Sequence, residues 1–98
     1  MGEASVNVYL AGRIRGVPNY AETFARAADR LRVEGHTVFN PAAANQEGRP
    51  LRKIMAYLLT WLCEEADAIA LLPGWWRSGG ARIEWMLAKY LSLRIIYL

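Results

Sequence analysis

The residues Ser78, Gly79 and Gly80 directly precede an amphipathic segment and are well suited to holding an anion. Glycines at the start of a helix let backbone N–H groups approach a phosphate at the positive end of the helix dipole. Glu84 follows Gly80 by four residues, so it lies in the first turns of that helix, toward a ligand held by the loop. Alternatively, Glu84 is a solvated carboxylate that the helix dipole stabilises. The residues alone leave both interpretations open.

A second candidate segment follows the first predicted strand and carries two arginines. Gly12 and Gly16 permit tight turns or a close approach of the backbone to a ligand. Arg13 and Arg15 carry planar guanidinium groups that match a phosphate or a carboxylate. Tyr9 stands near the end of the strand itself. In the alternative interpretation both arginines are solvated and Tyr9 is an aromatic residue of the core.

Trp75 and Trp76 are adjacent in a loop that begins with Gly74. Two neighbouring tryptophans in such a loop cannot both face the core. We therefore expect at least one of them to stack on a base or to contact a partner chain.

An alternation of strands and helices must position these residues. Strands are predicted at residues 5–10, 36–39, 68–72 and 94–98. Helices are predicted from Asn19 to Gly35, from Pro50 through Leu62, and over residues 81–91. This order, with short right-handed crossovers, predicts a single domain with an open parallel sheet of about four to five strands and helices on both faces. Residues 68–72 are apolar throughout, as in a central parallel strand.

The helix pattern also predicts caps and buried faces. Asn19 is the expected N-cap of the first helix, with Glu22 three residues later. The expected inward residues of the second helix are Leu51, Ile54, Met55, Leu58, Leu59 and Leu62. Those of the third are Ile83, Leu87, Tyr90 and Leu91. Since ligands bind outside the carboxyl ends of parallel strands, the loops at residues 11–19, 40–49 and 73–80 are the expected site.

Composition narrows the class of partner. The chain has 98 residues, of which 54% are hydrophobic, yet no apolar run approaches the length of a membrane span. The net charge of +3 comes from scattered basic residues, which favours a small anion and makes nucleic acid an unexpected partner. The single cysteine, Cys63, can form no internal disulfide and has no metal-ligand spacing. The first eight residues include an acid and lack an apolar signal segment, so we expect a cytoplasmic protein.

Short motifs across nearly the whole chain resemble one protein family. The motifs are VYLAG at residues 8–12, IRG at 14–16, GH at 35–36, Asn40 with Pro41, ADAI at 66–69, LPGW at 72–75 and S-x-G-A-x-x-E at 78–84. Together they resemble DUF4406, a largely phage and bacterial family that looks related to the nucleoside 2-deoxyribosyltransferases and the deoxynucleoside 5′-monophosphate N-glycosidases. The resemblance implies a flavodoxin-like, three-layer α/β/α fold.

The resemblance also implies a chemistry. Glu84 matches a glutamate that attacks the anomeric carbon of a 2′-deoxynucleoside and forms a covalent ester, and Tyr9 matches a tyrosine that orients this carboxylate. The serine at 78 and the IRG motif resemble the monophosphate N-glycosidases, whose serine and arginine hold a 5′-phosphate. The expected substrate-binding residues are Gly12, Arg13, Arg15, Gly16, Asn40, Pro41, Trp75, Ser78, Gly79 and Gly80. No cofactor or metal is expected, and the relatives imply a homo-oligomer.

The chain departs from the catalytic relatives at Leu59, where they carry an aspartate that assists departure of the base. General acid catalysis typically contributes about 10²- to 10⁴-fold, so its loss favours a second hypothesis, a nucleotide-binding sensor without turnover. A third hypothesis is a ribonucleotide or nicotinamide-nucleotide glycohydrolase on a similar sheet. A fourth is an interaction protein that uses Trp75, Trp76 and the basic surface.

Overall fold

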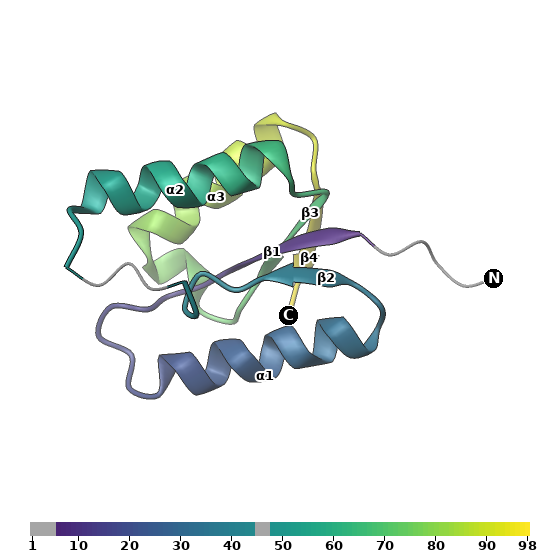
Figure 1. Ribbon diagram of the computed structural model, residues 1–98, viewed down its shortest axis with the longest axis horizontal. Helices are drawn as coiled ribbons and strands as arrows, with labels where there is room; N and C mark the ends of the chain where they lie inside the picture. Colours follow the sequence, from purple (N-terminus) through teal and green to yellow (C-terminus); the bar gives the residue numbers. More distant parts are fainter. Residues whose placement is uncertain (1–5, 45–47) are drawn as a thin grey trace.

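The four strands of the computed structural model, which describes residues 6–44 and 48–98, form one parallel sheet (Figure 1). The strands are β1 (Asn7–Ala11), β2 (Thr37–Phe39), β3 (Ala68–Leu71) and β4 (Arg94–Tyr97). Their order is β2-β1-β3-β4, so the direction of winding reverses between β1 and β3. All four predicted strands are confirmed, although residue 5 of the first prediction and residues 45–47 of the predicted loop lie outside the described residues.

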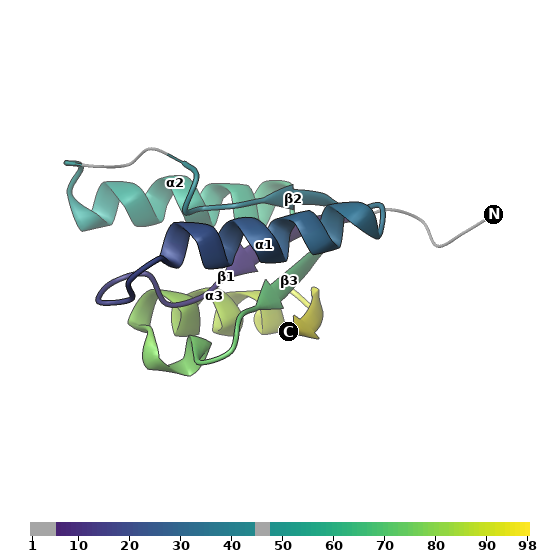
Figure 2. The same ribbon diagram turned by 90° about the horizontal axis from the view of Figure 1, so that it is seen from below.

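The helices cover both faces of the sheet. They are α1 (Tyr20–Val33), α2 (Leu51–Glu64) and α3 (Gly79–Tyr90), with a short 3₁₀ turn, η1 (Trp75–Arg77), before α3. Helix α1 lies along one face, and α2 and α3 lie side by side on the other (Figures 1 and 2). This is the expected flavodoxin-like three-layer α/β/α arrangement.

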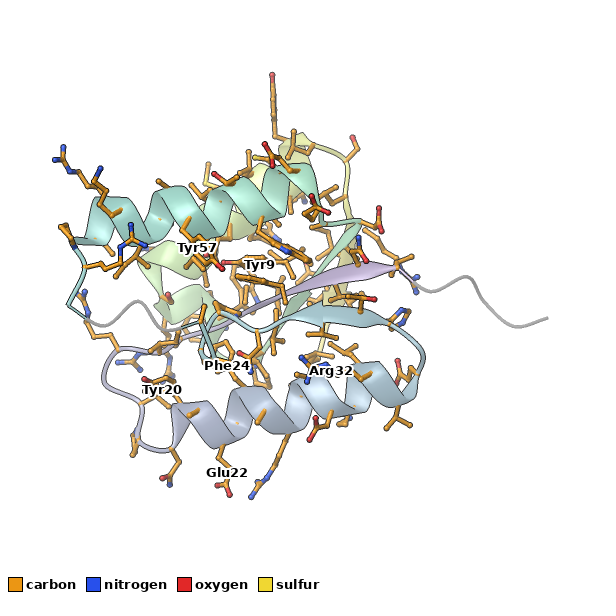
Figure 3. All side chains as sticks on the ribbon, viewed as in Figure 1. Tyr9, Tyr20, Glu22, Phe24, Arg32 and Tyr57 are labelled. Carbon is orange, nitrogen blue, oxygen red and sulfur yellow. The ribbon has the colours of Figure 1, made fainter. Side chains whose placement is uncertain are left out.

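Alternation along β1 divides the core into two layers. Val8 and Leu10 pack with Phe24 beneath α1, whereas Tyr9 faces α2 and packs in a cluster with Leu62 (Figure 3). The four residues of β3 are all buried, as the apolar run predicted for a central strand. The sheet therefore holds the Tyr9 side chain in the layer between β1 and the α2 and α3 helices.

Asn19 is the N-cap residue of α1 as predicted, whereas the predicted burial of Leu51 is wrong. Asn19 makes no side-chain hydrogen bond to α1, because its backbone is left-handed with φ of 60° and its carbonyl, rather than its side chain, accepts from Thr23 N. Leu51 on α2 does not face the sheet and is 60% exposed.

The buried face of α3 also differs from the predicted one. Ala81, Glu84 and Ala88 are buried, whereas Ile83 and Tyr90 are 51% and 86% exposed. Leu91 is exposed as well. Alanines let α3 pack closely on the sheet, which turns the large apolar residues outward. None of the described helices is both long and apolar enough to cross a membrane.

Candidate active site

Tyr9 and Glu84 form a buried pair between β1 and α3. The Tyr9 ring stacks on Phe39 at 5.5 Å between centroids and lies 6.2 Å from Trp61, so its position is fixed by packing. The Tyr9 hydroxyl donates a 2.6 Å hydrogen bond to Oε2 of Glu84. Residues far apart in the sequence are therefore brought together in the way that the resemblance implied.

Glu84 is the one buried charged side chain among the described residues, with 5% of its surface exposed. Burial raises the pKa of its carboxyl to about 7 from 4.5, while the hydrogen bond from Tyr9 opposes this rise. Burial and the adjacent Glu84 charge raise the pKa of the Tyr9 hydroxyl far above its ordinary value, so Tyr9 keeps its proton and acts as the donor. Near neutral pH the carboxyl can thus lose or hold a proton, and Tyr9 fixes one of its oxygens.

The start of α3 supplies hydrogen-bond donors. Ser78 is the N-cap, and its Oγ accepts from Ala81 N at 3.2 Å. Since that bond uses only the acceptor capacity of the hydroxyl, the Ser78 O–H can still donate to a ligand. Gly79 and Gly80 begin the helix, where N–H groups have no carbonyl partner within the helix itself. Helix α3 therefore begins two residues earlier than predicted, and its first turn favours an anion.

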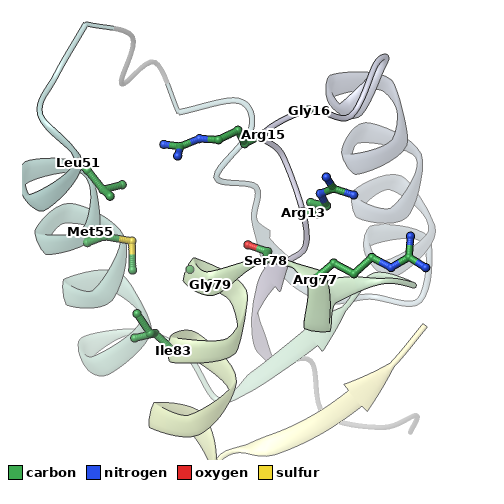
Figure 4. Close-up of a pocket in the computed structure, with 10 residues that line it drawn as sticks. Arg13, Arg15, Gly16, Leu51, Met55, Arg77, Ser78, Gly79 and Ile83 are labelled. Carbon is green, nitrogen blue, oxygen red and sulfur yellow. The ribbon is translucent and has the colours of Figure 1, made fainter.

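A cavity of about 590 Å³ opens at this end of the sheet (Figure 4). The loop after β1 contributes Arg13, Arg15 and Gly16, and the segment from η1 into α3 contributes Arg77, Ser78, Gly79, Gly80 and Ile83. Leu51 and Met55 of α2 form the remaining wall. Among the described residues, the lining holds three arginines and no carboxylate, and the size of the cavity lies within the range of small-molecule sites. It lies where the winding of the sheet reverses, the usual ligand position in such folds.

The cavity has a polar and an apolar side. In Figure 4 the Arg15 side chain reaches toward α2, the Ser78 hydroxyl points toward the open space, and Arg13 and Arg77 lie toward α1. Gly16 has φ of 77°, a left-handed conformation that favours glycine and turns the arginine-bearing loop. The arginines and Ser78 thus form the polar side of the cavity, and α2 and Ile83 form its apolar wall.

Glu84 itself is not one of the residues that line this cavity. It follows Gly80 by one helical turn, so it lies directly beneath a lining residue on the same face of α3. A Cβ at position 80 would stand at ordinary contact distance, 3.8 Å from Met55 Sδ and 3.9 Å from Ser78 Oγ, so Gly80 leaves the space between these two atoms unfilled.

Four of the expected substrate-binding residues lie outside the cavity lining. Gly12 has a packing role, because a Cβ there would stand 2.8 Å from Leu72 Cδ1. The Asn40 side chain accepts from Ala42 N at 3.0 Å in a turn that follows β2 and includes Pro41. Trp75 packs on Trp85 and Tyr97 rather than on the cavity.

The cavity also contains residues that the sequence analysis did not select. Arg77 directly precedes Ser78 in the sequence, and this position was a signal that it could line the same site. Leu51, Met55 and Ile83 are predicted to be inward residues of their helices, whereas Leu51 and Ile83 are exposed and all three line the cavity.

Comparison with known proteins places the chain in a family. A search of curated proteins finds no match to it. The model of the family described as "Domain of unknown function (DUF4406)" matches residues 6–97, which include every residue of the cavity and the Tyr9 and Glu84 pair. The chain therefore belongs to the DUF4406 family.

Proposed function

We propose that this protein cleaves or transfers the N-glycosidic bond of a 2′-deoxynucleoside or its 5′-monophosphate through a covalent intermediate on Glu84. The observation that carries the proposal is the buried hydrogen bond from Tyr9 to Glu84 beneath a cavity rich in arginine. An isolated buried carboxylate is costly for a fold to keep, and a perturbed pKa in such a position is typical of a functional group.

The proposed reaction has two displacements. In the first, Oε1 of ionised Glu84 bonds to C1′ of the sugar as the C1′–N bond breaks, and the base leaves with the bonding electrons and takes up a proton from water. In the second, water attacks C1′ and frees the carboxylate, or a nitrogen of a second base attacks in its place. The attacking group gives its proton to solvent. Two displacements at one carbon retain its configuration.

The other residues bind and orient the substrate. Tyr9 holds Oε2 of Glu84 and so directs Oε1 toward the sugar. Arg15, Ser78 and the N–H groups of Gly79 and Gly80 are placed to hold a 5′-phosphate through charge-assisted hydrogen bonds. The proposed steps need no metal or cofactor.

Release of free base tests this function. The four deoxynucleoside 5′-monophosphates, the matching nucleosides and the four ribonucleotides are incubated with the protein, and free base is measured by chromatography. We expect base from a deoxynucleotide and none with Glu84→Gln, which keeps the shape of the side chain but cannot form the ester. Cleavage of ribonucleotides alone would support the glycohydrolase hypothesis, and no cleavage of any compound would contradict the catalytic proposal.

A nucleotide-binding sensor is the second candidate, and Leu59 is the observation that favours it. Leu59 is partly buried against the cluster that contains Tyr9, where the relatives carry an acid. Within residues 6–44 and 48–98, no carboxylate that could protonate a leaving base lines the cavity. Leu59→Asp should raise the rate of base release, whereas Leu59→Asn, of the same size but without an acidic proton, should not. A folded Leu59→Asp protein that binds nucleotide without releasing base favours the sensor.

A further inference from the structure

A second cavity, of about 270 Å³, lies beside α1 at the same end of the sheet. Its own lining is mostly apolar and consists of Val17, Thr23, Phe24, Leu72, Pro73 and Gly74. Arg13 and Arg77 line this cavity and the larger one, so the two guanidinium groups stand at the boundary between them. Figure 4 shows both side chains on the α1 side of Ser78, away from Arg15.

The two arginines at the boundary have no carboxylate partner within residues 6–44 and 48–98. Arg77 stacks over the exposed Trp76 ring, with its Cζ 4.8 Å from the centroid, so its direction is partly fixed. Arg13 packs near the Gly16 backbone, its Nη2 being 3.5 Å from the place a Cβ would occupy there. Two cations from different loops that line the same boundary make a position at which an anion is favoured.

An anion at that boundary would have one cavity on each side. A phosphate monoester carries one organic group and would leave the smaller cavity empty. A phosphodiester carries two organic groups, one for each cavity, and its single negative charge would lie between the arginines. In this cavity Pro73 is exposed and Val17 is partly exposed, whereas Phe24 and Leu72 are almost wholly buried. The apolar surface of Val17 and Pro73 suits the face of a base better than a second charged group.

We propose that the two cavities together bind a phosphodiester-linked deoxydinucleotide. The linking phosphate, on O3′ of the nucleoside that donates its sugar, lies between Arg13 and Arg77, and the second nucleoside lies in the cavity beside α1. This inference rests on the proposed function and narrows its substrate class. The nucleoside that donates its sugar occupies the larger cavity above Glu84, and the second nucleoside contributes binding only.

Calorimetry with three matched ligands tests the proposal. For each base, the ligands are the deoxynucleoside 5′-monophosphate, the same nucleotide with a methyl phosphodiester on O3′, and the 5′-phosphorylated homodinucleotide in which a second nucleoside is esterified to that 3′-phosphate. The methyl ester has the charge of the dinucleotide without its second nucleoside. We expect the dinucleotide to bind at least about tenfold more tightly than the methyl ester, since burial of a base removes apolar surface from water.

A variant that fills the smaller cavity tests whether this cavity causes the tighter binding of the dinucleotide. Thr23 lines that cavity and not the larger one, so Thr23→Trp should remove the advantage of the dinucleotide and leave monophosphate binding unchanged. Thr60→Trp is the control, because Thr60 is likewise an exposed helical threonine whose hydroxyl bonds to the carbonyl four residues before it. The Thr60→Trp protein should still bind the dinucleotide more tightly than the methyl ester.

The outcomes separate this inference from the function on which it rests. Equal binding of dinucleotide and methyl ester, or an advantage that survives Thr23→Trp, overturns the two-cavity site, while base release from monophosphates would still stand. A dinucleotide advantage that Thr23→Trp removes, without any base release, supports the site and contradicts catalysis. Failure of every ligand to bind contradicts both.

Discussion

The Tyr9 hydroxyl and the Glu84 carboxylate meet at 2.6 Å although 75 positions of sequence separate them. Tyr9 comes from the sheet and Glu84 from α3, and both side chains lie in the interior. Burial of Glu84 disfavours the charged form of its carboxyl, while the Tyr9 hydroxyl donates a hydrogen bond to one of the carboxyl oxygens. This relationship is the basis of the predictions below.

Tyr9→Phe should lower activity while the fold persists. The ring keeps its stacking on Phe39, but Glu84 loses the hydrogen bond that opposes the rise of its pKa. A hydrogen bond to a charged group contributes about 1.5 to 3 kcal/mol, so we expect a fall in rate of about 10- to 100-fold near neutral pH. The rising limb of the pH–rate profile should also move to higher pH.

Tyr57→Phe is the matched control for that variant. Tyr57 belongs to the same aromatic group, with its ring 6.0 Å from Phe39, but it is exposed and has no contact with Glu84 among the described interactions. Steady-state kinetics from pH 5 to about 9 should leave its profile unchanged. Equal effects of the two substitutions would show that Tyr9 acts through packing alone.

The elevated pKa of Glu84 predicts a dependence of stability on pH. The folded carboxyl titrates at about 7 and the unfolded one at 4.5, so between these values the folded state holds the proton more tightly. The contribution of Glu84 to the free energy of unfolding is therefore fully present below pH 4.5 and is lost as the pH rises to about 7. The loss amounts to about 3 kcal/mol.

Glu84→Gln isolates this effect from the other titrating groups. Urea unfolding at pH 5 and at about pH 8 should show that wild type loses stability relative to the variant across this interval. A constant difference between the two proteins would mean that Glu84 titrates normally. If Glu84 is the nucleophile, the wild-type rate should rise over the same interval, because only the ionised carboxylate attacks.

The general fold was predictable because periodicity and apolar runs determine strands and helices locally. The run at residues 68–72 predicted the central strand, and the glycines before Glu84 predicted that a helix begins there. The orientation of α3 was not predictable in this way, because Ala81 and Ala88 pack closely on the sheet and large residues such as Ile83 turn outward. Ile83 reaches the wall of the cavity through that tertiary packing, which sequence periodicity alone does not reveal.

Arg15→Ala should weaken binding of monophosphates more than binding of nucleosides. The Arg15 side chain reaches into the cavity, and one charge-assisted hydrogen bond contributes about 1.5 to 3 kcal/mol. Calorimetry should show wild type preferring the monophosphate by this amount and the variant losing most of the preference. Arg26→Ala is the control, since Arg26 pairs with Glu22 on the surface of α1. A wild-type protein with equal affinities for nucleoside and monophosphate would remove the phosphate site.

The outward face of α3 predicts a homo-oligomer. Ile83, Met86 and Tyr90 are large, apolar and exposed on consecutive turns, which is the kind of surface that protein interfaces cover. Light scattering at micromolar concentration should give a mass above the 11.1 kDa of one chain. Met86→Glu should shift the protein toward the monomer, whereas Lys89→Glu at the neighbouring exposed position should shift it less. A wild-type monomer would contradict the prediction.

Trapping of the covalent intermediate tests the central claim, that Glu84 is the nucleophile, most directly. A 2′-fluorinated deoxynucleotide with a good leaving group has an electron-poor sugar, which slows release of the ester more than its formation. Intact mass spectrometry should show wild type heavier by one fluorosugar, peptide mapping should place the label on Glu84, and Glu84→Ala should remain unlabelled. A label on any other residue, or binding of the compound with no adduct at all, would contradict the assigned role of Glu84.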